Sequence, residues 1–316
     1  TEAVFTSYDV STTIYEIPLV FYQQKLDQVV LKKLNVESRH ANLAPWNAMM
    51  EQFRVRTGKV KIGIVGKYMD LHDAYKSVYE ALFHAGLACG TEVELIKIDS
   101  SQLEGDTDTE AILGSKRPDG ALDGVLVPGG FGQRGINGMV KAAEWARTNQ
   151  VPYFGICLGM QIMVIEWARN VLGWKDADST EFNQETKHPV VSLLEEQIDV
   201  KNYGGTMRLG RSETVAVDGS KLLAAYKEKH IFERHRHRYE FSNVYRSEML
   251  ASGLQLAGFT PDGSLVECVE WPKHPWGLGV QFHPEFTSRP TKPQPLFRDF
   301  VAAAKAYQEH KREKKQ

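Results

Sequence analysis

A cysteine follows an apolar run in this chain, with a glycine two positions away on either side. The run Val151–Ile156 predicts a buried strand, and it leads into Gly155-Ile156-Cys157-Leu158-Gly159. The two glycines indicate a sharp turn from strand to helix, because larger side chains would clash with the neighbouring strand and helix. Cys157 would then lie at the positive end of a helix that begins near Gly159, which favours its thiolate form. The alternative is a buried structural cysteine in a glycine-rich turn.

Other apolar runs alternate with helical patterns along the chain. Val60–Gly66, Val93–Ile98 and Leu122–Val127 are short and rich in β-branched residues, as in buried strands. Asp73–Ala88 and Asn137–Asn149 have apolar residues at helical spacing. This alternation predicts an α/β fold with a mostly parallel central sheet and helices on both faces. After about residue 173, short strands and turns are expected instead.

A second chemical motif follows the last predicted strand, Leu278–Phe282. There His283-Pro284-Glu285 places a base and a carboxylate two residues apart. Side chains at i and i+2 of an extended segment point to the same side, and Pro284 stiffens the segment. Glu285 can therefore accept a hydrogen bond from one imidazole nitrogen of His283 while the other faces Cys157. The two motifs together predict a catalytic triad.

A third motif is the glycine loop Pro128-Gly129-Gly130-Phe131-Gly132, which follows the strand predicted at Leu122–Val127. Acyl transfer passes through an oxyanion that backbone N–H groups commonly bind. Here the donors would be Gly130 and Leu158. Glycine loops also bind phosphates, but this one lacks G-x-G-x-x-G, and the chain has no P-loop. An oxyanion hole is therefore the favoured interpretation.

Composition excludes several other classes of function. Cys89, Cys157 and Cys268 are an odd number without paired spacing, which indicates a reducing, cytoplasmic compartment, and we expect no metal site. The net charge of −2 gives no argument for nucleic acid or an anionic membrane. No apolar run reaches the ~20 residues that span a bilayer, and no secretory signal is visible. The basic run Arg234–Arg238 is short and flanked by Glu233 and Glu240, so a nucleic-acid partner is not expected.

The three motifs together resemble the class I glutamine amidotransferases. They are Pro128–Gly132, Gly155–Gln161 and His283–Glu285, and the resemblance covers roughly residues 58–305. It implies a flavodoxin-like α/β fold and hydrolysis of glutamine to glutamate and ammonia, with no cofactor for that step. A γ-glutamyl hydrolase with the same triad remains an alternative. A catalytically silent regulatory or assembly module is a further one, and it would require a broken triad.

Further segments resemble the CTP synthase family, namely Val65–Tyr68, Asp73–Val78, Gly204–Gly210 and Glu233–Glu240. This implies that residues 1–57, with a short helical segment, are the end of a synthetase domain and its linker. Residues 58–305 would be the amidotransferase domain, and 306–316 a charged tail. ATP, Mg²⁺ and UTP would bind a synthetase domain that this chain lacks, so CTP formation is not expected from this chain alone. The family also implies a homo-oligomer, a tetramer, when the protein is full-length.

The same resemblance assigns residues to L-glutamine. Glu181 would bind the ammonium group and Arg238 the carboxylate, the latter as a charge-assisted fork. Gln161 lies one helical turn after Cys157 and would reach the substrate from the same face. The full set of implied glutamine contacts is Gly130, Phe131, Leu158, Gln161, Glu181 and Arg238.

The glycine-rich segment around Gly204, Gly205 and Arg208 has a sequence typical of a flexible loop. By resemblance it is a lid that couples the glutaminase to nucleotide binding, with GTP as allosteric activator.

Overall fold

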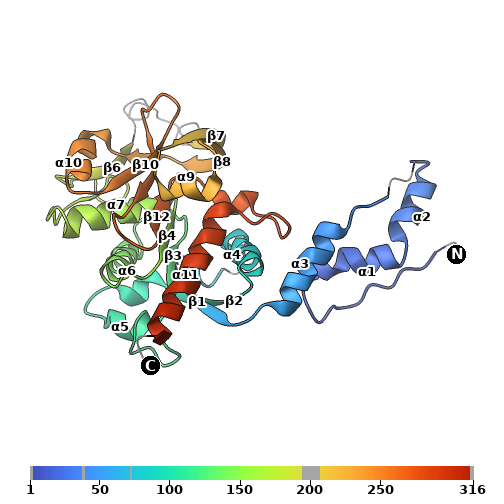
Figure 1. Ribbon diagram of the computed structural model, residues 1–316. Coiled ribbons are helices and arrows are strands. Elements are labelled where there is room, and N and C mark those ends of the chain that lie inside the picture. The colour runs from blue at the N-terminus through green and yellow to red at the C-terminus, as the bar shows by residue number, and fades with distance from the viewer. Residues whose placement is uncertain (1–2, 38–39, 72, 194–206, 314–316) are drawn as a thin grey trace.

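The computed structural model describes residues 3–37, 40–71, 73–193 and 207–313 (Figure 1). Within these ranges the chain forms a large mixed sheet covered by helices, with an N-terminal helical segment that extends from one side. None of the helices in the described ranges is long and apolar enough to cross a membrane.

The large sheet has nine strands in the order β2-β1-β3-β4-β12-β11-β10-β7-β8. Its first half is parallel, since β2, β1, β3, β4 and β12 all run in the same direction. Strands β1, β3, β4 and β12 are almost fully buried, as expected where helices cover both faces of a sheet, whereas the edge strand β2 is mostly half-buried. The bounds of the parallel strands are Lys59–Gly66 (β1), Glu92–Asp99 (β2), Gly124–Val127 (β3), Tyr153–Ile156 (β4) and Gly277–Val280 (β12).

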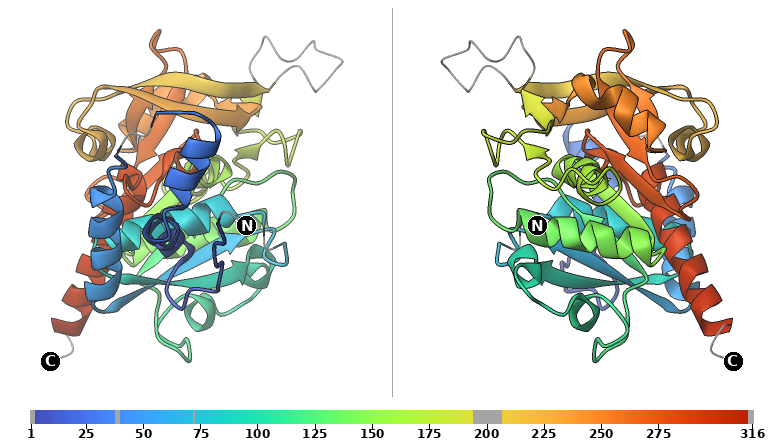
Figure 2. Two further views of the ribbon diagram at one scale, coloured as in Figure 1. Left: turned by 90° about the vertical axis from the view of Figure 1, so that its right-hand side faces the viewer. Right: turned by 90° about the vertical axis from the view of Figure 1, so that its left-hand side faces the viewer.

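The second half of the sheet is antiparallel. It contains β7 (Arg208–Ala216), β8 (His230–His237), β10 (Gln255–Phe259) and β11 (Val266–Glu270). A separate small sheet joins β5 (Asp178–Ser179), β6 (Pro189–Leu193) and β9 (Tyr239–Phe241). In Figures 1 and 2, β7 and β8 lie at the end of the molecule opposite the C-terminal end of α11.

Two hydrophobic cores lie on the two faces of the parallel strands. Helices α6 (Ile136–Thr148) and α7 (Leu158–Asn170) pack on one face, and α4 (Lys76–Ala88) and α11 (Pro295–Glu313) on the other. Neighbouring residues of one strand serve different cores: in β4, Tyr153 joins the first and Phe154 the second. The shorter helices are α5 (Thr109–Ile112), α9 (Lys221–Tyr226) and α10 (Arg246–Ala251).

The N-terminal segment is held against the main body mainly through α4. It contains α1 (Ile17–Gln23), α2 (Leu26–Lys33) and α3 (Ala44–Val55). Met49 and Met50 of α3 pack on Leu87 of α4 in a small third core. Short 3-10 turns complete the described elements: η1 (Ile14–Glu16), η2 (Ser100–Leu103), η3 (Asn243–Tyr245) and η4 (Pro284–Thr287).

The α/β fold predicted from the sequence is confirmed, and the predicted strands and helices lie within a few residues of the observed ones. The region after residue 173 has longer strands than expected, since β7 has nine residues and β8 has eight, and the two form one antiparallel ladder. The charged C-terminal residues up to Glu313 continue α11 without a break.

Candidate functional site

The three predicted motifs converge because their strands are neighbours in the sheet. β3, β4 and β12 are adjacent and parallel, so their carboxyl ends meet at one edge. β3 leads into the glycine loop at Pro128, β4 into Cys157, and β12 into Gln281 and then His283. Residues separated by more than 100 positions therefore lie around one point.

Cys157 occupies a strained turn between β4 and α7. Its φ is 53° and its ψ −102°, a conformation that side chains rarely adopt. Gly155 and Gly159 permit the turn: a Cβ on Gly155 would lie 2.4 Å from the carbonyl oxygen of Gly159, and one on Gly159 would lie 2.1 Å from that of Val127. The strain aims the thiol out of the sheet at the N-terminus of α7, where the helix dipole favours a thiolate.

His283 and Glu285 are arranged as the spacing predicted. His283 Nδ1 and Glu285 Oε1 are 2.8 Å apart. A methyl group on Gly129 would lie 2.9 Å from His283 Cε1 and 3.6 Å from Cys157 Cβ, so the imidazole and the thiol share one wall. Burial lowers the pKa of His283, but Cys157 and then Glu285 raise it, and the result is a pKa of about 10. His283 is therefore protonated at neutral pH and lies beside Cys157 as a cation.

The raised pKa of His283 also has a consequence for stability against pH. Its folded-state value of about 10 lies above the ordinary 6.5. The stabilisation from the charged imidazole is therefore fully present below pH 6.5, and it is lost as the pH rises through about 10.

We expect iodoacetamide to modify Cys157 selectively at about pH 6.5, because the thiolate is the nucleophile in alkylation. Burial, with Asp299, raises the pKa of Cys89 to about 11, and burial raises that of Cys268 well above its usual value. Peptide mass spectrometry after a short exposure measures the extent of modification at each of the three cysteines. Equal labelling of Cys89 or Cys268 under these conditions would contradict the expectation that Cys157 is the reactive cysteine.

The glycine loop lies next to the nucleophile, and both line one cavity. A Cβ on Gly130 would lie 3.2 Å from Leu158 Cδ2, so the two predicted oxyanion donors are neighbours. Phe131 is 45% exposed, and its N–H donates to the Tyr68 hydroxyl over 3.3 Å. Tyr68 thereby helps to fix the loop.

Glu181 and Lys67 form hydrogen bonds with the backbone of the glycine loop. The Gly132 N–H donates to Glu181 Oε1 over 2.8 Å, so this carboxylate lies beside the loop. Lys67 is almost fully buried, and its Nζ donates to the carbonyl oxygens of Phe131 and Gly132. Burial lowers the pKa of Lys67 to about 8, although Glu181 opposes the shift.

Gln161 on α7 is hydrogen-bonded to the residue that follows Arg238. Gln161 is 4% exposed, and its Nε2 donates to the carbonyl oxygen of Tyr239 over 3.0 Å. Arg238 is half-buried and precedes Tyr239 at the start of β9. The chain segment with the predicted carboxylate ligand is thus tied to the first turns of α7, which follow Cys157.

Of the predicted lid residues, the structure describes only Arg208. Gly204 and Gly205 lie outside the described residues. Arg208 begins β7, and its guanidinium pairs with Glu267 and lies 3.7 Å from Glu240. Arg208 is therefore anchored in the fold.

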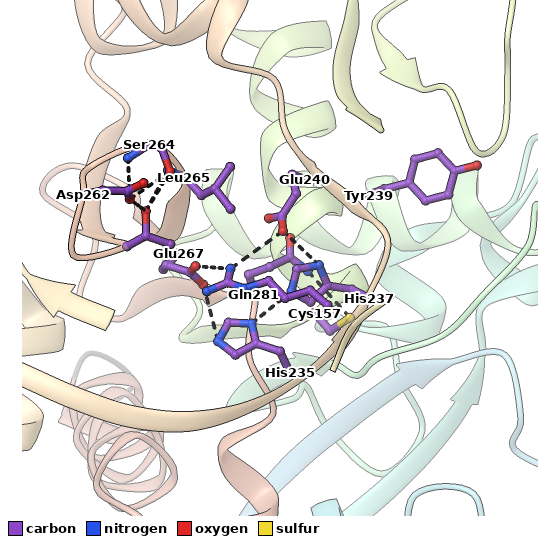
Figure 3. A network of polar contacts seen from close by, with 12 residues as sticks. Cys157, His235, His237, Tyr239, Glu240, Asp262, Ser264, Leu265, Glu267 and Gln281 are labelled. Atoms are coloured by element: carbon purple, nitrogen blue, oxygen red, sulfur yellow. Dashed lines mark hydrogen bonds and ion pairs between the residues drawn. The ribbon is translucent and has the colours of Figure 1, made fainter. Parts of the chain in front are cut away.

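A polar cluster of His235, His237, Glu240 and Glu267 lies close to Cys157 (Figure 3). All four side chains are at least 97% buried. Burial and Arg208 lower the pKa of His235 to about 2 and that of His237 to about 3, so both imidazoles are neutral at neutral pH. Burial and Glu267 raise the pKa of Glu240 to about 8.

A cavity of about 210 Å³ opens onto Cys157 and His283. This volume suits a small metabolite, since drug-sized ligands occupy pockets of roughly 300–1,000 Å³. Gly130, Phe131 and Arg236 also line it. Among the described residues, no group of three or more His, Cys, Asp or Glu side chains is placed to hold a metal ion.

Sequence reasoning missed three polar residues at this site: Lys67, Tyr68 and Gln281. Each follows a buried strand at the edge where the motifs meet. A polar residue directly after an apolar run was the available signal, but the same pattern ends many ordinary strands.

Comparison with known proteins agrees with this geometry. Residues 70–303 match the model of the family described as glutamine amidotransferase class-I. The CTP synthase of Pelotomaculum thermopropionicum is 48% identical over 308 residues, which cover 98% of this chain and 56% of that protein. The CTP synthase of Carboxydothermus hydrogenoformans is 50% identical over 302 residues, covering 96% and 55%. The chain thus spans about half the length of the curated relatives it matches.

A solved structure is similar to this chain in its fold as well as in its sequence. It is the glutaminase domain of Trypanosoma brucei CTPS with bound acivicin, at 42% sequence identity and a TM-score of 0.72. The similarity covers 78% of this chain and 94% of that one. The geometry around Cys157 and these similarities together show that the chain belongs to the class I glutamine amidotransferase family.

Proposed function

We propose that this chain hydrolyses L-glutamine to glutamate and ammonia, with Cys157 as nucleophile, His283 as acid and base, and Glu285 as the group that orients His283. The observation that carries the proposal is the meeting of Cys157, the His283–Glu285 pair and the glycine loop at the ends of three adjacent strands. The similarity to a glutaminase domain with bound acivicin supports it.

The geometry supports a two-step reaction. The Cys157 thiolate attacks the side-chain amide carbon, and the N–H groups of Gly130 and Leu158 bind the oxyanion. The imidazolium of His283 gives its proton to the leaving nitrogen, so ammonia departs and a γ-glutamyl thioester remains. His283 then takes a proton from water as the water attacks the thioester. Glutamate is released and the thiolate is restored.

We propose further that the ammonia serves an ATP-dependent amination of UTP to CTP, as the names of the curated relatives imply. ATP, Mg²⁺ and UTP would bind a synthetase domain, of which residues 1–57 would be the end, while residues 58–305 would form the amidotransferase domain and 306–316 a tail. A cytoplasmic location and a tetrameric full-length protein belong to the same proposal, and three free cysteines support the location.

The coupling of the glutaminase to GTP through Gly204, Gly205 and Arg208 also remains a proposal. Its support is that Arg208, at the start of β7, pairs with Glu267 and Glu240. Both carboxyls belong to the polar cluster near Cys157 (Figure 3). No observation on the described residues favours a γ-glutamyl hydrolase or a silent module, because the triad is complete and the similarity to CTP synthases spans 98% of the chain.

The direct test is to incubate the protein with L-glutamine and measure glutamate and ammonia in equal amounts. Assays with GTP and with a supplied synthetase domain extend the test, because the family implies that both act on the rate. Failure to release ammonia under all of these conditions would refute the proposal.

Glu181→Gln is expected to raise the KM for glutamine about 10- to 100-fold, the effect of losing a charge-assisted hydrogen bond. Glutamine at this position can still accept the Gly132 N–H, so the loop is kept while the charge for the substrate ammonium is removed. Glu185→Gln is the matched control, since Glu185 is an exposed carboxylate four residues away. Steady-state kinetics measure both. An unchanged KM in Glu181→Gln would exclude Glu181 as the ammonium ligand.

A further inference from the structure

Gln281 makes a contact with the nucleophile that the triad does not account for. It follows β12 and precedes His283 by two residues. Its side chain is fully buried, and its Nε2 donates to Cys157 Sγ over 3.7 Å, as Figure 3 shows. A buried amide must pair its donors and acceptors with other groups, and here the partner of the Gln281 donor is the sulfur of Cys157.

The orientation of the Gln281 amide is fixed by a chain of hydrogen bonds. The carbonyl oxygen of Tyr239 can only accept, so the nearby amide atom of Gln161 must be Nε2, at 3.0 Å. The same Nε2 donates its second hydrogen to Gln281 Oε1 over 3.3 Å. The other end of the Gln281 amide, its NH₂ group, is therefore the end that faces the sulfur of Cys157.

The Gln281 NH₂ group differs from the charged groups around Cys157 because it is a neutral donor. His283, backed by Glu285, is the group that exchanges protons, and Arg236 lines the open cavity. The neutral imidazoles of His235 and His237 and the buried carboxyls of Glu240 and Glu267 lie near Gln281 (Figure 3). Arg208 forms ion pairs with both carboxyls. Gln281 is a neutral donor, so it can stabilise negative charge on sulfur without taking part in proton transfer.

We propose that Gln281 is a catalytic residue that hydrogen-bonds the Cys157 thiolate, holds the sulfur toward the substrate carbon, and stabilises it again as the leaving group of the thioester. This inference rests on the proposed glutaminase function. In the first step the sulfur bonds to the amide carbon and ammonia leaves. In the second, water adds to the thioester, the carbon–sulfur bond breaks, and the electron pair returns to the sulfur that Gln281 faces.

The same chain of bonds connects the nucleophile to substrate binding. Tyr239 directly follows Arg238, the proposed carboxylate ligand. Gln161 donates hydrogen bonds to both the Tyr239 carbonyl oxygen and Gln281 Oε1. Gln281 thus contacts the reacting sulfur directly, and it is connected to the proposed substrate-binding segment only through Gln161.

The test measures alkylation of Cys157 by iodoacetamide against pH in the full chain, for the wild type, Gln281→Leu and Gln281→Glu. Loss of the donor is expected to move the midpoint upward by about one pH unit, and a carboxylate at this position should move it further. Gln294→Leu is the matched control, because Gln294 is an equally buried amide that bonds Tyr226 and Glu233 instead. Circular dichroism checks folding, and Gln281→Met replaces the leucine variant should that one not fold.

The outcomes separate this inference from the proposed function, because iodoacetamide needs no glutamine site. An upward shift in the Gln281 variants that is absent in Gln294→Leu supports the role of Gln281. An unchanged midpoint in folded Gln281 variants overturns it, even where the wild type hydrolyses glutamine. Rapid-quench detection of the thioester gives a second readout: its breakdown should be about tenfold slower in Gln281→Leu than in the wild type, and an unchanged breakdown rate would contradict the leaving-group role.

Discussion

Cys157→Ala is expected to abolish glutamine hydrolysis, with a loss of about 10⁶-fold in turnover. The alanine variant has no atom that can form the thioester, and the remaining oxyanion donors and the His283–Glu285 pair can only assist a direct attack by water. The fold should be unaffected, because Cys157 is small and its strained backbone is fixed by Gly155 and Gly159. Ammonia release and the thermal unfolding midpoint, measured side by side, check both expectations.

Cys89→Ala and Cys268→Ala are the controls for this loss. Both residues are free cysteines that do not line the cavity at Cys157. Cys268 is buried in the core on the α4–α11 face of the sheet, and the partly buried Cys89 packs against that core. We expect both variants to retain the activity of the wild type, with a cost in stability from the smaller side chain. A fully active Cys157→Ala variant, or an inactive Cys89→Ala or Cys268→Ala variant that is folded, would show that the nucleophile has been assigned wrongly.

The local parts of the site could be predicted from the sequence because they are encoded within a few residues. The turn at Cys157 needs glycines at Gly155 and Gly159, and the His283–Glu285 contact follows from the two-residue period of extended chain. In both cases the physical constraint acts between near neighbours. The strand ahead of each motif was also predictable, since a short apolar run rich in β-branched residues favours a buried strand.

The parts that could not be predicted depend on which strands become neighbours. β12 lies beside β4 although more than 100 residues separate them in the chain. The antiparallel half of the sheet follows from the same pairing, because β11 adds to the free edge of β12. Strand order is set by packing across the whole domain, and a single sequence carries no local signal of it.

Gln281 shows the same limit at the level of one side chain. Its sequence neighbours indicate only a polar residue next to a strand, whereas its role depends on Gln161 and Cys157, both far away in the sequence. Lys67 is similar, since its buried ammonium is explained only once the carbonyl oxygens of the glycine loop are placed above it. Buried polar groups must be paired, so the structure, and not the motif, identifies the partners.

Gly159→Ala is expected to damage stability and activity together, through the contact between α7 and β3. The added methyl group would lie 2.1 Å from the carbonyl oxygen of Val127, a backbone atom that cannot rotate away. Helix α7 must therefore move, which also disturbs the bond from the Tyr153 hydroxyl to the Gly159 carbonyl oxygen. We expect the free energy of unfolding to fall by about 3 kcal/mol, the upper part of the range for overpacked cores.

The same displacement should lower turnover by about 100-fold, because the Leu158 N–H moves with the helix and an oxyanion donor shifted by ~1 Å no longer fits the transition state. Gly258→Ala in β10 is the matched control: its methyl group would lie 2.8 Å from Leu222 Cδ2, the end of a side chain that can rotate. Urea unfolding and steady-state kinetics on both variants measure the two effects. Wild-type turnover in a folded Gly159→Ala variant would mean that the close approach of α7 to β3 does not position the oxyanion donor, and that the glycine is needed for folding alone.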